Sequence, residues 1–91
     1  MHMFMIEREI PEVGTFKREQ LQGAASKSNE ALRQLKPKIQ WQYSYVAGNK
    51  TFCVYLAEDE AAIHEHSKLS GFPATKITPI LRIIDPTTEH N

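Results

Sequence analysis

The order of strand-like and helix-like segments is the feature that most constrains the fold of this chain. Four runs are typical of strands: residues 3–9 and 39–47 alternate with a period of two, residues 51–57 form the return strand of a hairpin, and residues 76–84 form a last strand. Apolar residues recur at helical spacing in two further runs, one between the first two strands and one after the third. The sequence therefore predicts the order β-α-β-β-α-β.

The ends of these elements carry residues that favour helix starts and stops. Thr15 is the predicted N-cap of the first helix, and Pro37 ends that helix. The second helix begins after the acidic residues 58–60 and is expected to end near Ser70, before Gly71. A proline in the last strand removes a ladder donor, so that strand is expected at a sheet edge or with a bulge.

This order predicts an α+β fold, the ferredoxin-like sandwich, with a four-stranded antiparallel sheet and two helices on one face. The second and fourth strands are expected at the edges. The other sheet face would be bare and apolar, so we expect a homodimer that stacks two sheets as a dimeric α/β barrel. The chain is expected to be one domain, residues 1–91, with a core at about 3–85 and a polar tail at 86–91.

Composition excludes several classes of partner. Lysine plus arginine number 11 and aspartate plus glutamate number 11, so the net charge is zero, which argues against nucleic acid and anionic membranes as partners. No apolar run approaches the roughly 20 residues that span a bilayer. The single cysteine, Cys53, suits a reducing compartment, and we expect a cytoplasmic protein.

The stretch "AIHEHSKLSGFPA" holds two of the four histidines, and neither forms a metal motif alone. Residues two apart on a helix point roughly 200° away from each other, so His64 and His66 are not expected to share an ion. His66 lies on the apolar stripe with Ala62, Ile63 and Leu69, and is expected to be a hydrogen-bonded core residue or a ligand. His64 is expected on the outer face.

The register of the hairpin decides which side chains share the bare face with Glu7. A three-residue loop at 48–50 pairs Val46 with Phe52. A two-residue turn at Gly48-Asn49 instead moves the side chains of the second strand to the opposite faces of the sheet. We favour the three-residue loop because it groups Val46 with the apolar residues of the third strand. The bare face would then hold a ligand pocket of five residues: Trp41, Tyr43, Tyr45, Cys53 and Tyr55. An aromatic dimer interface explains the same pattern.

The segments "IQWQYSYVAGNKTFCVYLAEDEAAIHEHSKLSGFPATKI" and "IIDPTT" resemble a family of small bacterial ferredoxin-like domains of unknown-function or nickel-binding type. The resemblance covers nearly the whole chain. It is carried by Glu7, Trp41, Ser44, Tyr45, Val46, Lys50, Cys53, Tyr55, Glu58, His66, Gly71, Phe72, Pro73, Asp85 and Pro86.

The resemblance implies a homodimer that binds nickel or another divalent transition metal and acts in metal sequestration or handling. Such a site would draw on His66, His64 and Glu7, with Glu60 or Glu65 as further candidates. Related sequences often carry histidine where this chain has a tyrosine at position 43, and a tyrosine hydroxyl is a poorer nickel ligand.

The alternative is a small-molecule-binding or enzymatic dimeric barrel that uses the open sheet face. No catalytic residue is predicted.

Overall fold

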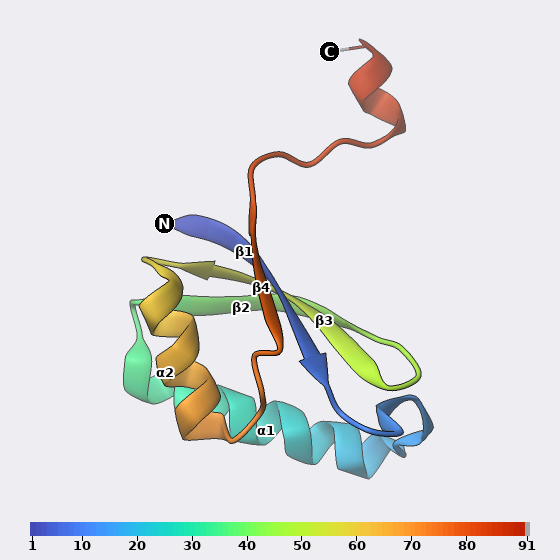
Figure 1. Ribbon diagram of the computed structural model, residues 1–91, viewed down its shortest axis with the longest axis vertical. Coiled ribbons are helices and arrows are strands. Elements are labelled where there is room, and N and C mark those ends of the chain that lie inside the picture. Colours follow the sequence, from blue (N-terminus) through green and yellow to red (C-terminus); the bar gives the residue numbers. More distant parts are fainter. Residues whose placement is uncertain (91) are drawn as a thin grey trace.

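The computed structural model describes residues 1–90 and has the predicted α+β arrangement in two layers (Figure 1). Its strands are β1 (His2–Glu9), β2 (Ile39–Val46), β3 (Lys50–Ala57) and β4 (Lys76–Ile80). Its α-helices are α1 (Arg18–Leu35) and α2 (Glu60–Ser70). Two short 3-10 helices, η1 (Val13–Thr15) and η2 (Pro86–His90), precede α1 and follow β4. Asn91, the last residue of the predicted tail, lies outside the described residues.

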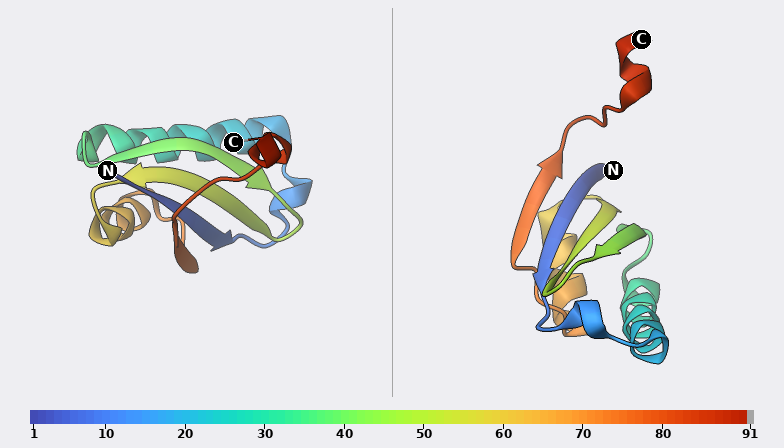
Figure 2. Two further views of the ribbon diagram at one scale, coloured as in Figure 1. Left: turned by 90° about the horizontal axis from the view of Figure 1, so that it is seen from above. Right: turned by 90° about the vertical axis from the view of Figure 1, so that its right-hand side faces the viewer.

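The sheet is antiparallel with the strand order β2-β3-β1-β4, so β2 and β4 form its edges as predicted. Pro79 lies in the edge strand β4, where a missing backbone donor is tolerated. Both helices lie on the same side of the sheet (Figure 2). This arrangement confirms the ferredoxin-like α+β fold.

Helix α1 begins later than the sequence suggested. Thr15 does not cap it, because Thr15 belongs to η1 and its hydroxyl donates to the carbonyl oxygen of Glu12 at 2.7 Å. The N-cap is Lys17, whose backbone N–H donates to the side-chain oxygen of Gln20 at 2.9 Å. The predicted stop before Pro37 is confirmed, since the helix ends at Leu35.

Helix α2 has the expected caps at both ends. The Asp59 carboxylate accepts a hydrogen bond from the backbone N–H of Ala62 at 3.0 Å, and Gly71 ends the helix with a left-handed φ of 79°. The buried face consists of Ala62, Ile63, His66 and Ser70. Leu69, which was assigned to this stripe, is instead half exposed, because Ser70 occupies the inward position beside it.

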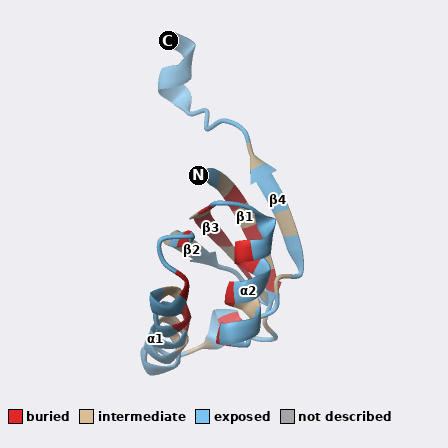
Figure 3. Cartoon of the chain, turned by 90° about the vertical axis from the view of Figure 1, so that its left-hand side faces the viewer, coloured by how far each residue is buried: buried red, intermediate tan, exposed pale blue. Residues whose placement is uncertain are grey.

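The core fills the space between the sheet and the two helices, and the buried residues in Figure 3 lie on these inner faces. Strand β1 contributes Phe4 and Ile6, which pair with Tyr55 and Cys53 of β3. Helix α1 adds Leu35 at its C-terminal end. Because side chains alternate along a strand, these pairings place every second residue of β1 and β3 under the helices.

The predicted hairpin register is wrong. The turn is the two-residue Gly48-Asn49 turn, since the N–H of Ala47 donates to the carbonyl oxygen of Lys50 and Val46 pairs with Thr51. The ladder then shifts between Trp41 and Tyr43, which makes Gln42 a bulge residue. The turn and the bulge together decide which face each side chain of β2 occupies.

The sheet face opposite the helices carries a mainly apolar set of side chains. The strand registers place on it Met3, Met5, Tyr43, Tyr45, Phe52, Val54, Leu56 and Ile80. Tyr45 is 60% exposed, and its ring packs edge-on against Tyr43 with 5.5 Å between centroids. We call this surface the open face.

The last strand is shorter than predicted. It ends at Ile80, and residues 81–90 run away from the body as an extended arm that ends in η2 (Figure 1). Leu81, Ile83 and Ile84 in this arm are all strongly exposed. No helix within residues 1–90 has both the length and the apolar character needed to cross a membrane.

Candidate functional site

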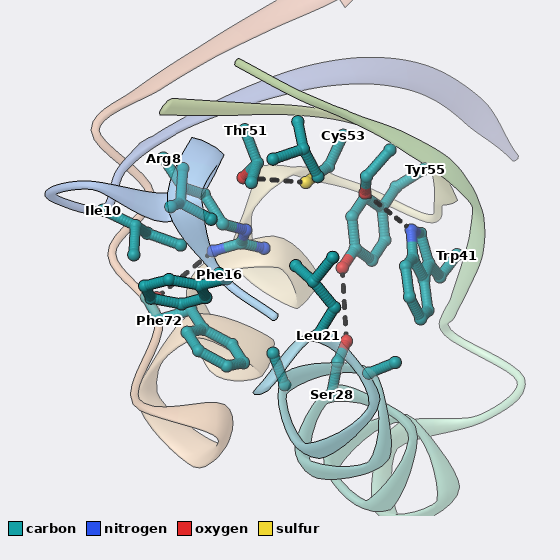
Figure 4. Close-up of a pocket in the computed structure, with 15 residues that line it drawn as sticks. Arg8, Ile10, Phe16, Leu21, Ser28, Trp41, Thr51, Cys53, Tyr55 and Phe72 are labelled. Carbon is teal, nitrogen blue, oxygen red and sulfur yellow. Dashed lines mark hydrogen bonds between the residues drawn. The ribbon is translucent and has the colours of Figure 1, made fainter. Parts of the chain in front are cut away.

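A cavity of about 270 Å³ lies between α1 and the helix-facing side of the sheet (Figure 4). Its wall is mainly apolar, with side chains from the sheet, from η1, from α1 and from the segment after α2: Ile10, Val13, Phe16, Leu21, Trp41 and Phe72. Beyond Leu21, helix α1 contributes small residues to this space: Ala24, Ala25 and Ser28. Small side chains here leave room that larger ones would fill, which explains the cavity.

Arg8 supplies the charge in this wall. The alternation of β1 places it on the same face as Phe4 and Ile6, and it is only 3% exposed. Its Nη1 donates to Ser67 Oγ at 3.1 Å and to two backbone carbonyls just after α2, at 3.0 and 3.2 Å. Its guanidinium also lies 5.7 Å from the centroid of the Tyr55 ring, within cation–π range.

A chain of hydrogen bonds leads from Arg8 across the interior to α1. Arginine can only donate, so the contact of 3.4 Å between Arg8 Nη2 and His66 Nδ1 makes Nδ1 the acceptor. The proton of the His66 ring is then on Nε2, which donates to Ser28 Oγ at 3.1 Å. Ser28 Oγ also lies 3.5 Å from the Tyr55 hydroxyl. Both helices and the sheet are therefore joined by one buried polar network.

The network is neutral apart from Arg8. Burial, and after it the nearby Arg8 charge, lower the pKa of His66 to about 4, although a hydrogen bond to Ser28 opposes this shift. Burial raises the pKa of Tyr55, although the Arg8 charge opposes this shift. At neutral pH the imidazole and the phenol are thus both uncharged, and the guanidinium carries the charge.

The predicted ligand pocket is divided between the two faces of the sheet. Tyr43 and Tyr45 lie on the open face, as expected. Trp41, Cys53 and Tyr55 lie on the helix-facing side, where all of them line the cavity. This division has two causes. The two-residue turn decides which face the side chains of β3 occupy relative to those of β2, and the bulge places the indole on the face opposite the two exposed tyrosines.

The remaining polar side chains of the cavity bond to one another. The Trp41 indole N–H donates to Ser44 Oγ at 2.9 Å, across the bulge. The Cys53 thiol donates to Thr51 Oγ1 at 3.5 Å. Figure 4 shows the Tyr55 hydroxyl directed toward Ser28, from the opposite side of the same space. The site is thus pre-formed, with a few polar groups in an apolar wall.

The predicted metal ligands lie in three separate places. His66 is fully buried and both of its ring nitrogens have hydrogen-bond partners. His64 is exposed on the outer face of α2. Glu7 lies on the open face, where its carboxylate is 3.2 Å from Lys50 Nζ and 4.0 Å from Lys76 Nζ.

A nickel ion does not fit these residues within one chain. Across residues 1–90 no three histidine, cysteine, aspartate or glutamate side chains are grouped as a metal site would require. A cation beside His66 would also be repelled by the Arg8 guanidinium. Within the described residues, the exposed ligands of one chain, such as His64, therefore do not assemble a nickel site.

Two members of the buried polar network, Arg8 and Ser28, had no role in the sequence-based predictions. Arg8 continues the alternation of Phe4 and Ile6, so the period of two places its charge on the buried face. Ser28 lies on the apolar stripe of the first helix, where a lone hydroxyl needs a buried partner. These two signals were present in the sequence, but the partner of each residue depends on tertiary contacts.

The comparisons with known proteins agree on the fold and on a family. The family model described as nickel responsive protein SCO4226-like matches residues 4–80. The crystal structure of SCO4226 from Streptomyces coelicolor A3(2) is similar with a TM-score of 0.75 at 13% identity, over 90% of this chain and 99% of that chain. A comparison with curated proteins finds no match.

Proposed function

The chain belongs to the nickel responsive protein SCO4226-like family, and we propose that it acts as a homodimer in the sequestration or handling of divalent metal ions, nickel in particular. The observation that carries the homodimer is the apolar surface that a single chain leaves exposed. The family match supports the metal. Because residues 1–90 of one chain do not group three ligands, we assign the metal ligands to two chains together.

The open face supports a contact with a second copy. Its exposed tyrosines, Tyr43 and Tyr45, stand beside partly buried apolar side chains from β1 and β3. Aromatic residues are enriched at interfaces, and large apolar patches are rare on monomers. A second open face has the same chemistry, so two sheets can cover each other in a two-fold contact.

The arm supports the same contact. Leu81 is 92% exposed, and Ile83 and Ile84 are also largely exposed. Three large apolar side chains on an extended segment gain several kcal/mol when a surface covers them, at about 1.5–3 kcal/mol for each side chain that is fully buried. In a dimer, the partner chain offers a surface that can cover these side chains, so we assign the arm to the interface.

The ligands available to a shared ion are exposed imidazoles. His2, His64 and His90 are exposed, and His90 stands at the end of the arm, 3.9 Å from the Glu89 carboxylate. Imidazole and carboxylate groups suit nickel. An arm that packs on a partner would carry an imidazole and a carboxylate to that partner's surface. The bound ion would be the cargo of the dimer.

We also place the protein in the cytoplasm. Its one cysteine, Cys53, is free and buried, in keeping with a reducing compartment.

Sedimentation and calorimetry of the tag-free protein test this proposal. At micromolar concentration we expect about twice the chain mass of 10.4 kDa, and a chain lacking residues 81–91 should shift toward the monomer. The two-fold contact repeats each shared site, so nickel titration should saturate at two ions for each dimer, and nickel should tighten the dimer because it binds only the assembled form. A monomer at all concentrations would overturn the homodimer.

Metal binding is tested separately from the dimer. Replacing His90 with alanine should weaken nickel binding, whereas Gln34→Ala, an exposed change on α1, should not. Full nickel affinity in the chain that lacks residues 81–91 would contradict the sharing of ligands through the arm. No heat with nickel, zinc or cobalt would overturn metal binding and leave the dimer standing.

A further inference from the structure

The buried guanidinium of Arg8 is not matched by an acidic side chain. Within residues 1–90, the carboxylates that lie within 4.0 Å of a cation belong to Glu7 and Glu89, and neither pairs with Arg8. The side chains that line the cavity include no aspartate or glutamate. An arginine that is 3% exposed is expected to be paired, because an isolated buried charge is costly.

The contacts that Arg8 makes reduce this cost without neutralising the charge. Its Nη1 group bonds the carbonyl oxygens of Phe72 and Pro73 and the hydroxyl of Ser67, at the C-terminal end of α2, where partial negative charge accumulates. These dipoles hold the guanidinium in place from one side. The residue also lines the cavity, so the other side of the charge faces a space that a ligand can occupy.

The size and wall of that space define the rest of the ligand. A dry cavity of about 150 Å³ can bind benzene, so 270 Å³ has room for a ring with a short chain and a carboxylate. The aromatic and aliphatic side chains of Phe16, Leu21, Trp41 and Phe72 would enclose such a body. A free inorganic anion would leave this apolar wall unused.

The polar groups beside Arg8 suit a carboxylate. The Tyr55 hydroxyl stays protonated because burial raises its pKa, so it can donate to an anion. Ser28, which lies 3.5 Å from it, offers a second hydroxyl on the same side. A carboxylate that accepts from a guanidinium makes charge-assisted bonds, which are stronger than neutral ones.

We propose that the cavity between α1 and the sheet is a binding site for a small monocarboxylic acid with an aromatic or aliphatic body, whose carboxylate pairs with Arg8. This site is separate from the open face and from the exposed histidines, so it does not depend on metal binding or on the dimer contact.

A matched pair of ligands tests the role of the charge. The metal-free protein, in buffer with a chelator, is titrated with 3-phenylpropanoate and with the neutral alcohol 3-phenylpropan-1-ol, using calorimetry and amide chemical shifts. We expect the acid to bind about tenfold more tightly or better, which is the effect of one charge-assisted contact. The shifts should centre on Ser28 and Tyr55. Equal affinities, or no binding of either ligand, would overturn the proposal.

A matched pair of variants tests whether the acid binds in this cavity. Ala25→Leu puts a larger side chain into the cavity, and Ala61→Leu makes the same change on the exposed face of α2. The first variant should lose at least about tenfold in affinity for the acid, and the second should bind like the wild type. Full binding by Ala25→Leu would show that the acid binds elsewhere.

Substitutions of Arg8 complete the test. Arg8→Met should abolish the preference for the acid over the alcohol, and Arg8→Lys should keep part of it, since the charge remains. If Arg8→Met does not fold, the acid and alcohol affinities of the wild type and of Arg8→Lys, together with the comparison of Ala25→Leu and Ala61→Leu, decide. A preference for the acid that persists in folded Arg8→Met would overturn the pairing with Arg8.

Discussion

His66 Nε2 lies 3.1 Å from Ser28 Oγ, a contact that joins α2 to α1 inside the protein. The same imidazole accepts from Arg8 through its other nitrogen, so one ring connects the two helices and β1. This position gives His66 a structural role in holding the wall of the cavity. It also makes the ring unavailable as a metal ligand in the folded chain.

We predict that His66→Ala destabilises the protein by roughly 1–3 kcal/mol, because it leaves a void and removes the partner of Ser28 and Arg8. His64→Ala, on the exposed face of the same helix, should stay within about 0.5 kcal/mol of the wild type. Urea denaturation followed by circular dichroism gives both values. Similar losses for the two variants would contradict the buried role.

The pKa of His66 predicts that stability falls as the solution is acidified. The folded protein holds this pKa near 4, below the ordinary value of 6.5, so the unfolded chain takes up the proton first. Stability from this group is therefore complete above about pH 6.5 and is lost as pH falls toward 4. The loss is roughly 3 kcal/mol at most.

Carboxylates also titrate at the lower end of this range, so the control is His66→Gln, which keeps an amide in place of the ring. The difference in unfolding free energy between wild type and His66→Gln should shrink between pH 6.5 and 4. A constant difference across that range would show that the imidazole does not titrate with folding.

Two glycines should respond in opposite ways to alanine. A Cβ at Gly14 would lie 2.6 Å from the carbonyl oxygen of Ala47 and 2.9 Å from Gly48 Cα, where η1 packs against the hairpin. A Cβ at Gly23, in the middle of α1, meets nothing within 4 Å. We predict that Gly14→Ala destabilises by about 1–3 kcal/mol and that Gly23→Ala stabilises by about 0.5–1 kcal/mol.

Thermal and urea unfolding of the two glycine variants measure these changes. The Gly14 position also tests the wall of the cavity, because neighbouring Val13 lines it. A neutral Gly14→Ala would mean that η1 can move away from the hairpin at little cost.

The element order and the fold could be predicted from the sequence because local patterns determine them. Alternation in β1, the stop before Pro37 and the cap at Gly71 all act within a few residues. The end of the last strand was less predictable. Its apolar pattern continues to Ile84, but pairing with β1 stops at Ile80, which lies opposite Met3, one residue from the start of β1.

The residues of the site could not be predicted, because the face that each side chain occupies depends on the register between two paired strands. One extra residue at Gln42 moves Trp41 to the face opposite Tyr43 and Tyr45. Nothing in the local pattern of β2 marks that position as a bulge. The turn had a similar effect, because the assumed three-residue loop placed the cavity residues Cys53 and Tyr55 on the wrong side of the sheet.

Deletions in β2 give the sharpest test of the bulge. Removing Gln42 should leave a regular ladder in which Trp41 still pairs with Tyr55, so we predict a loss of no more than about 1 kcal/mol. Removing Gln40 instead turns Ile39, which is 2% exposed, toward the open face, and the lost burial should cost roughly 2–5 kcal/mol. Urea unfolding monitored by the single tryptophan compares the two deletions directly. If deleting Gln42 costs as much as deleting Gln40, then Gln42 belongs to the regular ladder and the face assigned to Trp41 is wrong.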